Sequence, residues 1–242
     1  MKFSWIPYKP QIGSLLKAVL PNNMVVPILQ GRLRGKKWIV GSSNIEYVLG
    51  SYEYEARILF ERLVSKSSVV YDVGAHVGFY TLLASELVGA AGKVFAFEPV
   101  PRNLDYLKKH LEINHCANVV VVEAAVSDKS GTSLFDEGPT SCMGHLAEGG
   151  NLTVDLVSID DLVLSGKIPP PHYIKIDVEG AELLVLKGAK STLGNYVPEI
   201  FLSTHSHKLH IDCCNWLSSL GYELKPIIGS DLYNSSQLFA YK

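Results

Sequence analysis

Apolar residues along the chain fall into short, unbroken runs that alternate with helical patterns. The run Val69–Tyr71 is β-branched or aromatic throughout, which predicts a central parallel strand buried on both faces. Gly74 and Gly78 then bracket a tight turn, and the apolar positions that follow recur at helical spacing, at Phe79, Leu82, Leu83 and Leu87. A strand that feeds a helix in this way leaves backbone N–H groups at a crevice where open α/β sheets bind ligands.

The same alternation continues on both sides of this unit. The pattern predicts further strands at 93–97, 119–122, 173–176 and 200–203. The strand at 119–122, the third along the chain, is expected to continue through residues 123–128. It predicts helices at 52–63, 101–115, 179–190 and 209–220, and a terminal hairpin at 222–227 and 237–241. Strands that alternate with helices indicate a doubly wound, mostly parallel sheet.

Two segments depart from this alternation. Residues 1–50 are predicted to form an N-terminal extension, with an amphipathic helix over 11–20 and short strands between glycines over 24–49. Residues 51–242 then form the ligand-binding domain. Within it, residues 129–157 are rich in Gly, Ser and Thr, which predicts an insertion over one end of the sheet with a strand at 152–157.

Composition narrows the class of protein. The 242 residues are 47% hydrophobic, enough for a large core. A net charge of −2 and a pI of about 6.4 exclude a bulk basic field for nucleic acid or anionic lipid. No stretch reaches the roughly 20 apolar residues of a membrane span. The cysteines lack a CxxC spacing, which predicts no metal site and favours reduced thiols in a cytoplasmic protein; they are Cys116, Cys142, Cys213 and Cys214.

Glu98 gives the first indication of a ligand. It ends the strand predicted at 93–97, where an acid can accept hydrogen bonds from ribose hydroxyls, although a helix-capping role is the structural alternative. The turn from Gly74 to Gly78 lacks the third glycine that lets a helix approach a pyrophosphate. Together these features predict a cofactor with a ribose but no diphosphate, which points to S-adenosylmethionine and away from NAD. Asp72, after three apolar residues, needs partners that a ligand or the turn would supply.

A second dense stretch, Ile174-Lys-Ile-Asp-Val-Glu-Gly-Ala-Glu182, places three carboxylates at a strand's carboxyl end. Carboxylates there are costly unless they face water, a cation or a ligand's donors. This stretch and three others resemble the FkbM-type family of S-adenosylmethionine-dependent methyltransferases: Asp72-Val-Gly-Ala-His-Val-Gly-Phe-Tyr-Thr81, Phe97-Glu-Pro-Val-Pro-Arg-Asn103 and Ala125-Val-Ser-Asp128. The resemblance covers residues 50–225, with the motifs in the family's order.

The resemblance implies a class I methyltransferase fold. This is a Rossmann-like, doubly wound α/β fold whose mostly parallel seven-stranded sheet has the order 3-2-1-4-5-7-6 and an antiparallel last strand. By similarity, Glu98 would hold the ribose and Asp177 would lie between cofactor and substrate. The cofactor-binding residues that it implies are Asp72, Gly74, Ala75, His76, Gly78, Tyr80, Thr81, Glu98, Asn103, Ala125, Val126 and Asp177. His76 departs from the family, where Asn is more frequent, and residues 129–157 match it little.

The family typically methylates hydroxyl oxygens on sugars, lipids or other metabolites. The resemblance therefore implies an S-adenosylmethionine-dependent O-methyltransferase with a small-molecule or glycan-like hydroxyl substrate. A hydroxyl is a weak nucleophile that benefits from a nearby base. The candidate catalytic residues are Asp177, Glu179 and His205, and a histidine titrates in a range suited to a base. In the open alternatives, His205 is a solvated loop histidine, and Asp177 and Glu179 bind the cofactor ammonium or a metal ion, for which no clear ligand set is visible.

Other functions remain open at this stage. The alternative enzyme is a nucleic-acid base methyltransferase, which would more comfortably carry an Asn-Pro-Pro-Tyr-type segment where this chain has Asp177-Val-Glu179, so no nucleic acid partner is expected. A non-catalytic nucleoside-binding or interaction module is the alternative to an enzyme. The sequence also leaves open whether the protein forms a homodimer, and whether residues 137–151 build the acceptor pocket or a dimer contact. Ordinary packing is expected for Trp5 and Trp38.

Overall fold

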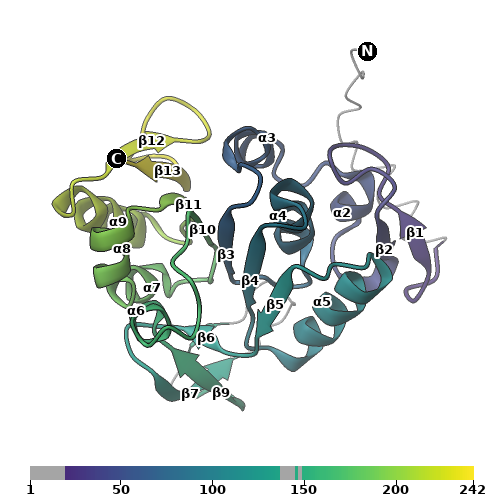
Figure 1. Cartoon of the computed structure of the whole chain (residues 1–242), viewed down its shortest axis with the longest axis horizontal. Coiled ribbons are helices and arrows are strands. Elements are labelled where there is room, and N and C mark those ends of the chain that lie inside the picture. The colour runs from purple at the N-terminus through teal and green to yellow at the C-terminus, as the bar shows by residue number, and fades with distance from the viewer. Residues whose placement is uncertain (1–19, 137–144, 147–148) are drawn as a thin grey trace.

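A central sheet with helices on both faces organises the computed structural model of this chain (Figure 1). The structure describes residues 20–136, 145–146 and 149–242. Trp5, Cys142, the helix expected over 11–20 and most of residues 137–151 therefore lie outside the described residues. Among the described residues, no helix has the length and apolar character that crossing a membrane requires.

The central sheet has seven strands. In spatial order they are β5 (Val119–Val122), β4 (Lys93–Phe97), β3 (Val69–Val73), β10 (Tyr173–Ile176), β11 (Glu199–Ser203), β13 (Gln237–Tyr241) and β12 (Glu223–Pro226). The first five pair in parallel, whereas β13 is antiparallel to both of its neighbours. Numbered along the chain, this is the predicted order 3-2-1-4-5-7-6, so the doubly wound sheet with an antiparallel last strand is confirmed.

Two hydrophobic cores cover the two faces of this sheet. Successive side chains of a strand point to opposite faces, so Val70 belongs to one core while Tyr71 and Val73 belong to the other. The first face is covered by α3 (Tyr54–Leu63), α4 (Phe79–Val88) and α5 (Pro101–Ile113). The second face is covered by α6 (Ile159–Leu164), α7 (Glu182–Lys187), α8 (Lys190–Tyr196) and α9 (His207–Ser219).

The chain after β10 differs from the prediction. The helix expected over 179–190 begins only at Glu182, because Glu179 and Gly180 have φ angles of 53° and 110°, outside the right-handed helical region. Glu179 and Glu182 are therefore not one helical turn apart, as the sequence suggested. The sequence patterns also did not include α6.

A second sheet lies beneath the carboxyl end of β5 in the view of Figure 1. Its four strands, in spatial order, are β6 (Ala125–Val126), β9 (Leu152–Val157), β7 (Gly131–Asp136) and β8 (His145–Leu146). The strand expected at 152–157 is confirmed. The continuation of the third strand over 123–128 is wrong, because β6 leaves the central sheet and pairs with β9. The limits of the insertion, 129–157, stay a prediction.

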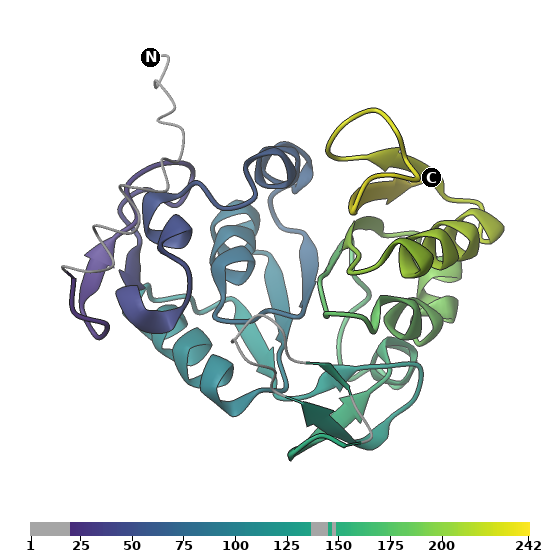
Figure 2. The same ribbon diagram turned by 180° about the vertical axis from the view of Figure 1, so that it is seen from behind.

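The first described elements pack against the central domain. They are β1 (Val25–Pro27), β2 (Lys37–Ile39), the 3₁₀ turn η1 (Val40–Ser42) and α2 (Ile45–Leu49), so the expected short strands are accompanied by a helix. Trp38 is completely buried and stacks on His110 of α5 at 3.8 Å between ring centroids, which confirms its packing role. Seen from behind, this hairpin and the terminal hairpin of β12 and β13 lie at opposite ends of the molecule (Figure 2).

Candidate functional site

The turn after β3 brings three strand ends together. Gly74 and Gly78 have φ angles of 82° and 96°, which glycine adopts without strain. The N–H groups of Gly74 and Ala75 both donate to the carbonyl of Phe97 at the end of β4, at 3.0 and 2.9 Å. A Cβ atom on Gly74 would lie 1.9 Å from the carbonyl oxygen of Asp177, which follows β10. The turn therefore requires glycine to let β3, β4 and β10 converge.

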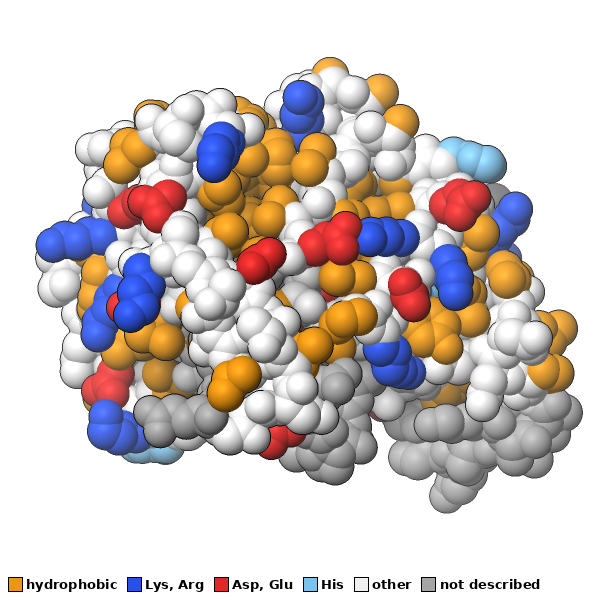
Figure 3. All heavy atoms as spheres, turned by 90° about the horizontal axis from the view of Figure 1, so that it is seen from below, with side chains coloured by type: hydrophobic (Ala, Val, Ile, Leu, Met, Phe, Trp, Pro, Cys, Tyr) orange, Lys and Arg blue, Asp and Glu red, His pale blue; other side chains and the backbone are white. Residues whose placement is uncertain are grey.

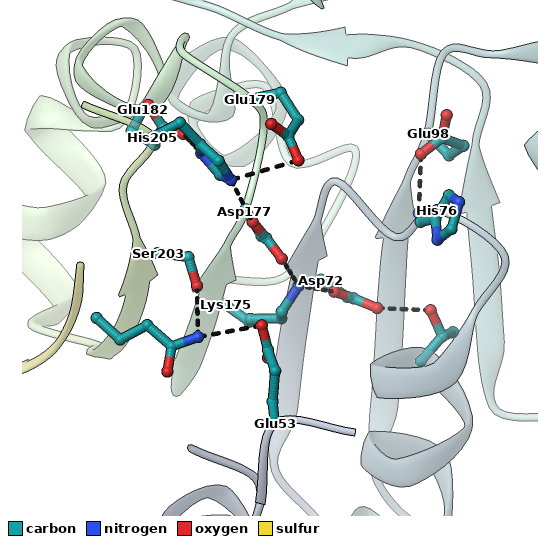
Figure 4. A network of polar contacts seen from close by, with 12 residues as sticks. Glu53, Asp72, His76, Glu98, Lys175, Asp177, Glu179, Glu182, Ser203 and His205 are labelled. Atoms are coloured by element: carbon teal, nitrogen blue, oxygen red, sulfur yellow. Dashed lines mark hydrogen bonds and ion pairs between the residues drawn. The ribbon is translucent and has the colours of Figure 1, made fainter. Parts of the chain in front are cut away.

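Glu98 is buried beside this turn. Its carboxylate accepts hydrogen bonds from the N–H groups of His76 (2.8 Å) and Val100 (3.0 Å) and from the side-chain amide of Asn103 (3.2 Å). Burial raises the pKa of Glu98 to about 7, although these three hydrogen bonds favour the charged form. Val100 directly precedes α5, so Glu98 binds the chain where that helix begins, although α5 itself has no side-chain cap; Figure 4 shows Glu98 next to His76 of the turn.

A pocket opens between the turn, Glu98 and Asp177, with about 930 Å³ of space that includes its mouth. The predicted cofactor-binding residues that line it are Gly74, Ala75, His76, Tyr80, Glu98, Ala125, Val126 and Asp177. Glu179 of the predicted catalytic group also lines it. Figure 3 looks at the molecule from below Figure 1, and there acidic side chains lie beside hydrophobic ones near the middle of the surface.

Four of the predicted cofactor-binding residues lie behind the pocket wall instead. Asp72 is 1% exposed and accepts a hydrogen bond from the hydroxyl of Thr81 at 2.6 Å. Asn103 donates to Glu98, and the N–H of Gly78 donates to the carbonyl of Ala75. These residues do not line the pocket because each is occupied in supporting a residue or turn that does.

Lys175 is a site residue that the sequence analysis did not select. It lies directly opposite Asp72 in the pairing of β10 with β3. Its ammonium is 3.2 Å from Asp177 and 3.9 Å from Asp72, and it lies 4.7 Å from the ring centroid of Tyr80. Burial lowers the pKa of Lys175, but the charges of Asp177 and Asp72 outweigh burial and hold it above its usual range. A charged residue within an otherwise apolar strand was the available signal.

His205, which follows β11, lies among three carboxylates (Figure 4). Its Nε2 atom is 3.4 Å from Asp177 and 3.3 Å from Glu179, and its Nδ1 atom is 2.6 Å from the fully buried Glu182. Burial lowers the pKa of His205, but hydrogen bonds to Glu179 and Glu182 and the charge of Asp177 outweigh it and raise the pKa to about 10. The structure thus brings the three predicted catalytic residues together. His205 is an exposed loop residue, as the structural alternative had it, but its ring is held by carboxylates that keep its pKa above the range expected of a base near neutral pH.

These three residues also have the donor set of a cation site. One donor atom from each of Asp177, Glu179 and His205 can be chosen so that all lie within 4.8 Å of one another. Within the described part of the chain, no other group of histidine, cysteine and acidic residues has this arrangement. The sequence lacked a visible ligand set because His205 is brought in from β11, far along the chain.

Aromatic residues of α2, of the segment before α3 and of α4 complete the pocket, and the acidic Glu53 lies next to Tyr52 in the chain. Tyr47, Tyr52 and Phe79 line it, with Tyr47 at 4.4 Å from Tyr52 and 5.1 Å from Phe79 between ring centroids. Glu53 accepts a hydrogen bond from the side chain of Gln237 at 3.0 Å, and burial, followed by the charge of Asp177, raises its pKa. None of these residues was predicted to belong to the site: Phe79 lies within the Asp72–Thr81 motif but was assigned only to the helix, and no motif contains Tyr47, Tyr52 or Glu53.

His76 occupies the turn itself. Its φ angle is 50°, its backbone N–H donates to Glu98, and its side chain lines the pocket. Burial, and then the positive charges of Lys175 and Arg102, lower the pKa of His76 to about 4. At neutral pH the imidazole is therefore uncharged.

Comparisons with solved structures bear on the fold. The crystal structure of methyltransferase FkbM from Methylobacillus flagellatus aligns with 73% of this chain and 44% of its own, at 23% identity and a TM-score of 0.53. The crystal structure of precorrin-6y C5,15-methyltransferase from Geobacter metallireducens covers 78% of this chain and 89% of its own, at 18% identity and a TM-score of 0.51. The implied class I methyltransferase fold is confirmed.

A curated relative matches the sequence more closely. Hexuronic acid methyltransferase AglP of Haloferax volcanii is 34% identical over 139 residues, which are 57% of this chain and 56% of that protein. This chain thus spans little more than half the length of that relative. The model of the methyltransferase FkbM domain matches residues 72–224, which contain the glycine turn, Glu98 and the His205 cluster. The chain therefore belongs to the methyltransferase FkbM domain family, as the resemblance of its motifs indicated.

Proposed function

We propose that the chain is an S-adenosylmethionine-dependent O-methyltransferase whose acceptor is a hydroxyl of a small molecule or glycan, with a sugar that carries a hexuronic acid as the first candidate. Membership of the methyltransferase FkbM domain family supports the reaction class. The relative named as a hexuronic acid methyltransferase supports the choice of acceptor.

The observation that carries the proposal is the buried carboxylate of Glu98 beside the Gly74 turn. The pocket between them is polar at Glu98 and Asp177 and apolar at Ala125, Val126 and Phe97, which fits a ribose and a purine base. Gly74 has no room for a side chain, so the backbone approaches the pocket closely. The residues present therefore fit S-adenosylmethionine, with Glu98 on the ribose hydroxyls and Ala125 and Val126 on the adenine.

When bound, the cofactor supplies a methyl group on a positively charged sulfur. The protein's task is to hold the acceptor hydroxyl in line with the carbon–sulfur bond, because positioning accounts for much of the barrier reduction in such displacements. Asp177 and Glu179 face the pocket and provide carboxylate oxygens that accept the hydroxyl's hydrogen bond. With the cofactor bound, one of these carboxylates would accept the proton that the acceptor hydroxyl loses as its oxygen takes the methyl group.

The test is transfer of a radiolabelled methyl group from S-adenosylmethionine to a panel of acceptors. The panel contains oligosaccharides with a hexuronic acid, the same oligosaccharides with that acid reduced to an alcohol, and transfer RNA. We expect label in the sugars and a loss of about a hundredfold or more in Asp177→Asn, the range in which a proton-accepting group contributes. Asp212→Asn, which removes an exposed carboxylate of α9 that pairs with Lys208, is the matched control and should retain activity.

Label in RNA alone would favour the nucleic-acid methyltransferase. No transfer to any acceptor by a protein that binds S-adenosylhomocysteine would favour the non-catalytic module. Either result contradicts the proposal.

A further inference from the structure

We propose that Asp177, Glu179 and His205 form a binding site for a first-row divalent cation, such as Mn²⁺, at the edge of the cofactor pocket. The site itself is argued from the geometry of these side chains. The role of the ion, which is to bind the acceptor oxygen, rests on the proposed function.

The donor atoms already have the spacing of a coordination sphere. Metal–ligand bonds of about 2.0–2.2 Å place neighbouring donors about 3.0–3.5 Å apart in octahedral or tetrahedral geometry. The Nε2 atom of His205 lies 3.4 Å from a carboxylate oxygen of Asp177 and 3.3 Å from one of Glu179. The three donors lie directly after β10 and β11, two neighbouring parallel strands whose carboxyl ends meet at the same edge of the sheet, which brings the donors together.

Glu182 provides a second, independent observation. It is completely buried, and its Oε1 atom binds Nδ1 of His205 at 2.6 Å and accepts the N–H of Gly180 at 3.1 Å. A carboxylate on one imidazole nitrogen orients the ring so that the other nitrogen can bind a metal, an arrangement that is common around metal-binding histidines. The second oxygen of Glu182 is buried without a hydrogen-bond partner, which is costly unless positive charge lies nearby.

The balance of charge also favours a cation here. Lys175 pairs with Asp72 and Asp177. Among the described residues, the ion pairs of Glu179 and Glu182 are with His205 alone. A divalent ion bound to Asp177 and Glu179 would take the place of the proton that these carboxylates hold on His205, since a histidine binds a metal in its neutral form.

The donor set limits the kind of ion. Carboxylate oxygens suit Mg²⁺, Ca²⁺ and Mn²⁺, whereas an imidazole nitrogen suits first-row transition metals such as Mn²⁺, Fe²⁺ and Zn²⁺. Three protein donors leave further coordination positions open, and Asp177 and Glu179 border the pocket. An acceptor hydroxyl bound at such a position would lose its proton more readily, because a metal ion lowers the pKa of a bound oxygen group.

The test is titration of MnCl₂ into chelator-treated protein. Calorimetry measures the heat of binding, and the electron paramagnetic resonance signal of free Mn²⁺ measures how much ion stays unbound. We expect one Mn²⁺ per chain and its displacement by ZnCl₂. Affinity should fall at least tenfold in Glu179→Gln and in His205→Asn, and about tenfold in Glu182→Gln, which keeps the three ligands but loses the orienting carboxylate. His207→Asn, which changes an exposed histidine two residues away, is the matched control and should bind Mn²⁺ as the wild type does.

The titration needs neither S-adenosylmethionine nor an acceptor, so its result is separate from the proposed methyl transfer. Thermal unfolding and S-adenosylhomocysteine binding of each variant show that the fold and the cofactor pocket are intact. The proposal is overturned if neither Mn²⁺ nor Zn²⁺ binds the wild type, or if folded Glu179→Gln and His205→Asn bind Mn²⁺ unchanged.

Discussion

At the scale of single residues, Glu98 combines a buried position with hydrogen bonds that favour its charged form. We predict that affinity for S-adenosylhomocysteine rises about tenfold from pH 6 to pH 8, because Glu98, with a pKa of about 7, must be ionised to accept hydrogen bonds from ribose hydroxyls. Glu98→Gln should lower affinity at pH 8 by about tenfold or more and remove the pH dependence. Calorimetry across this pH range measures both effects, and a pH dependence retained in Glu98→Gln would assign it to another group.

The same carboxyl has an effect of opposite sign on stability. Its pKa is raised from 4.5 to about 7 in the folded protein, so its contribution to the free energy of unfolding is present below pH 4.5 and is lost as the pH rises through 7. Glu98→Gln should flatten this part of the stability profile in urea denaturation. A profile that is unchanged in Glu98→Gln would count against the raised pKa.

Gly74 gives a test of the turn. Gly74→Ala places a methyl group 1.9 Å from the carbonyl of Asp177 at a φ of 82°, so we expect a loss of several kcal/mol in unfolding free energy, about 1–3 from the backbone strain alone. Gly89→Ala is the matched control, because its φ is 68° but nothing lies within 4 Å of the added carbon. With a ψ of −173° it should cost about 1–3 kcal/mol from the backbone strain, but without the further cost of the close contact at Gly74. Equal melting temperatures for the two variants would show that the close approach at Gly74 is unimportant.

Residue roles were predictable from the sequence where a short motif fixes them. Glu98 and Gly74 belong to such motifs, and the structure places both at the pocket. The raised pKa of His205 was not predictable, because it depends on hydrogen bonds to Glu179 and Glu182, which lie 26 and 23 positions earlier in the chain. Thr81 and Asn103 were predicted to bind the cofactor, yet their side chains bind Asp72 and Glu98 from behind the pocket wall, a distinction that requires side-chain directions.

At the scale of elements, His110 joins α5 to the N-terminal hairpin and to the glycine turn. Its Nε2 atom accepts the N–H of Ile39 at 3.1 Å, so its Nδ1 carries the proton and donates to the carbonyl of Val77 at 2.7 Å. The bond from Ile39 requires the neutral ring, whereas the bond to Val77 is kept when the ring is protonated. Burial accordingly lowers the pKa of His110 from 6.5 to about 4.

This coupling predicts a loss of stability in acid. A lowered histidine pKa contributes stability that is present above pH 6.5 and is lost as the pH falls through 4, an effect of about 3 kcal/mol at 1.36 kcal/mol per pKa unit. Urea denaturation of wild type and His110→Gln between pH 7 and pH 4 measures it. The variant should be less stable at pH 7 and should lose less on acidification. An equal loss in both proteins would assign the acid sensitivity to other groups, His76 among them.

Elements with strong apolar runs were predictable, and those set by special backbone angles or by long-range pairing were not. All seven strands of the central sheet follow the runs in the sequence. The late start of α7 depends on the positive φ angles of Glu179 and Gly180. The departure of β6 from the central sheet depends on its pairing with β9, about 30 residues later, which local pattern does not reveal.

At the scale of the whole molecule, the order of the strands determines where the chemistry lies. The parallel strands β3, β4, β10 and β11 end at one edge, so residues from four parts of the chain meet there: the glycine turn, Glu98, Asp177 and His205. This convergence at strand ends is the general location of ligand sites in open α/β sheets. It explains why motifs scattered over more than a hundred residues describe one pocket.

The assignment of the pocket to S-adenosylmethionine is tested most directly by calorimetric titration of S-adenosylhomocysteine into the wild type at pH 8. NAD is the control ligand, and Glu98→Gln is the control protein. We expect one binding site per chain for S-adenosylhomocysteine, no binding of NAD, and an affinity for S-adenosylhomocysteine reduced about tenfold or more in Glu98→Gln. Absence of S-adenosylhomocysteine binding, or equal binding by wild type and Glu98→Gln, would contradict the assignment of the pocket.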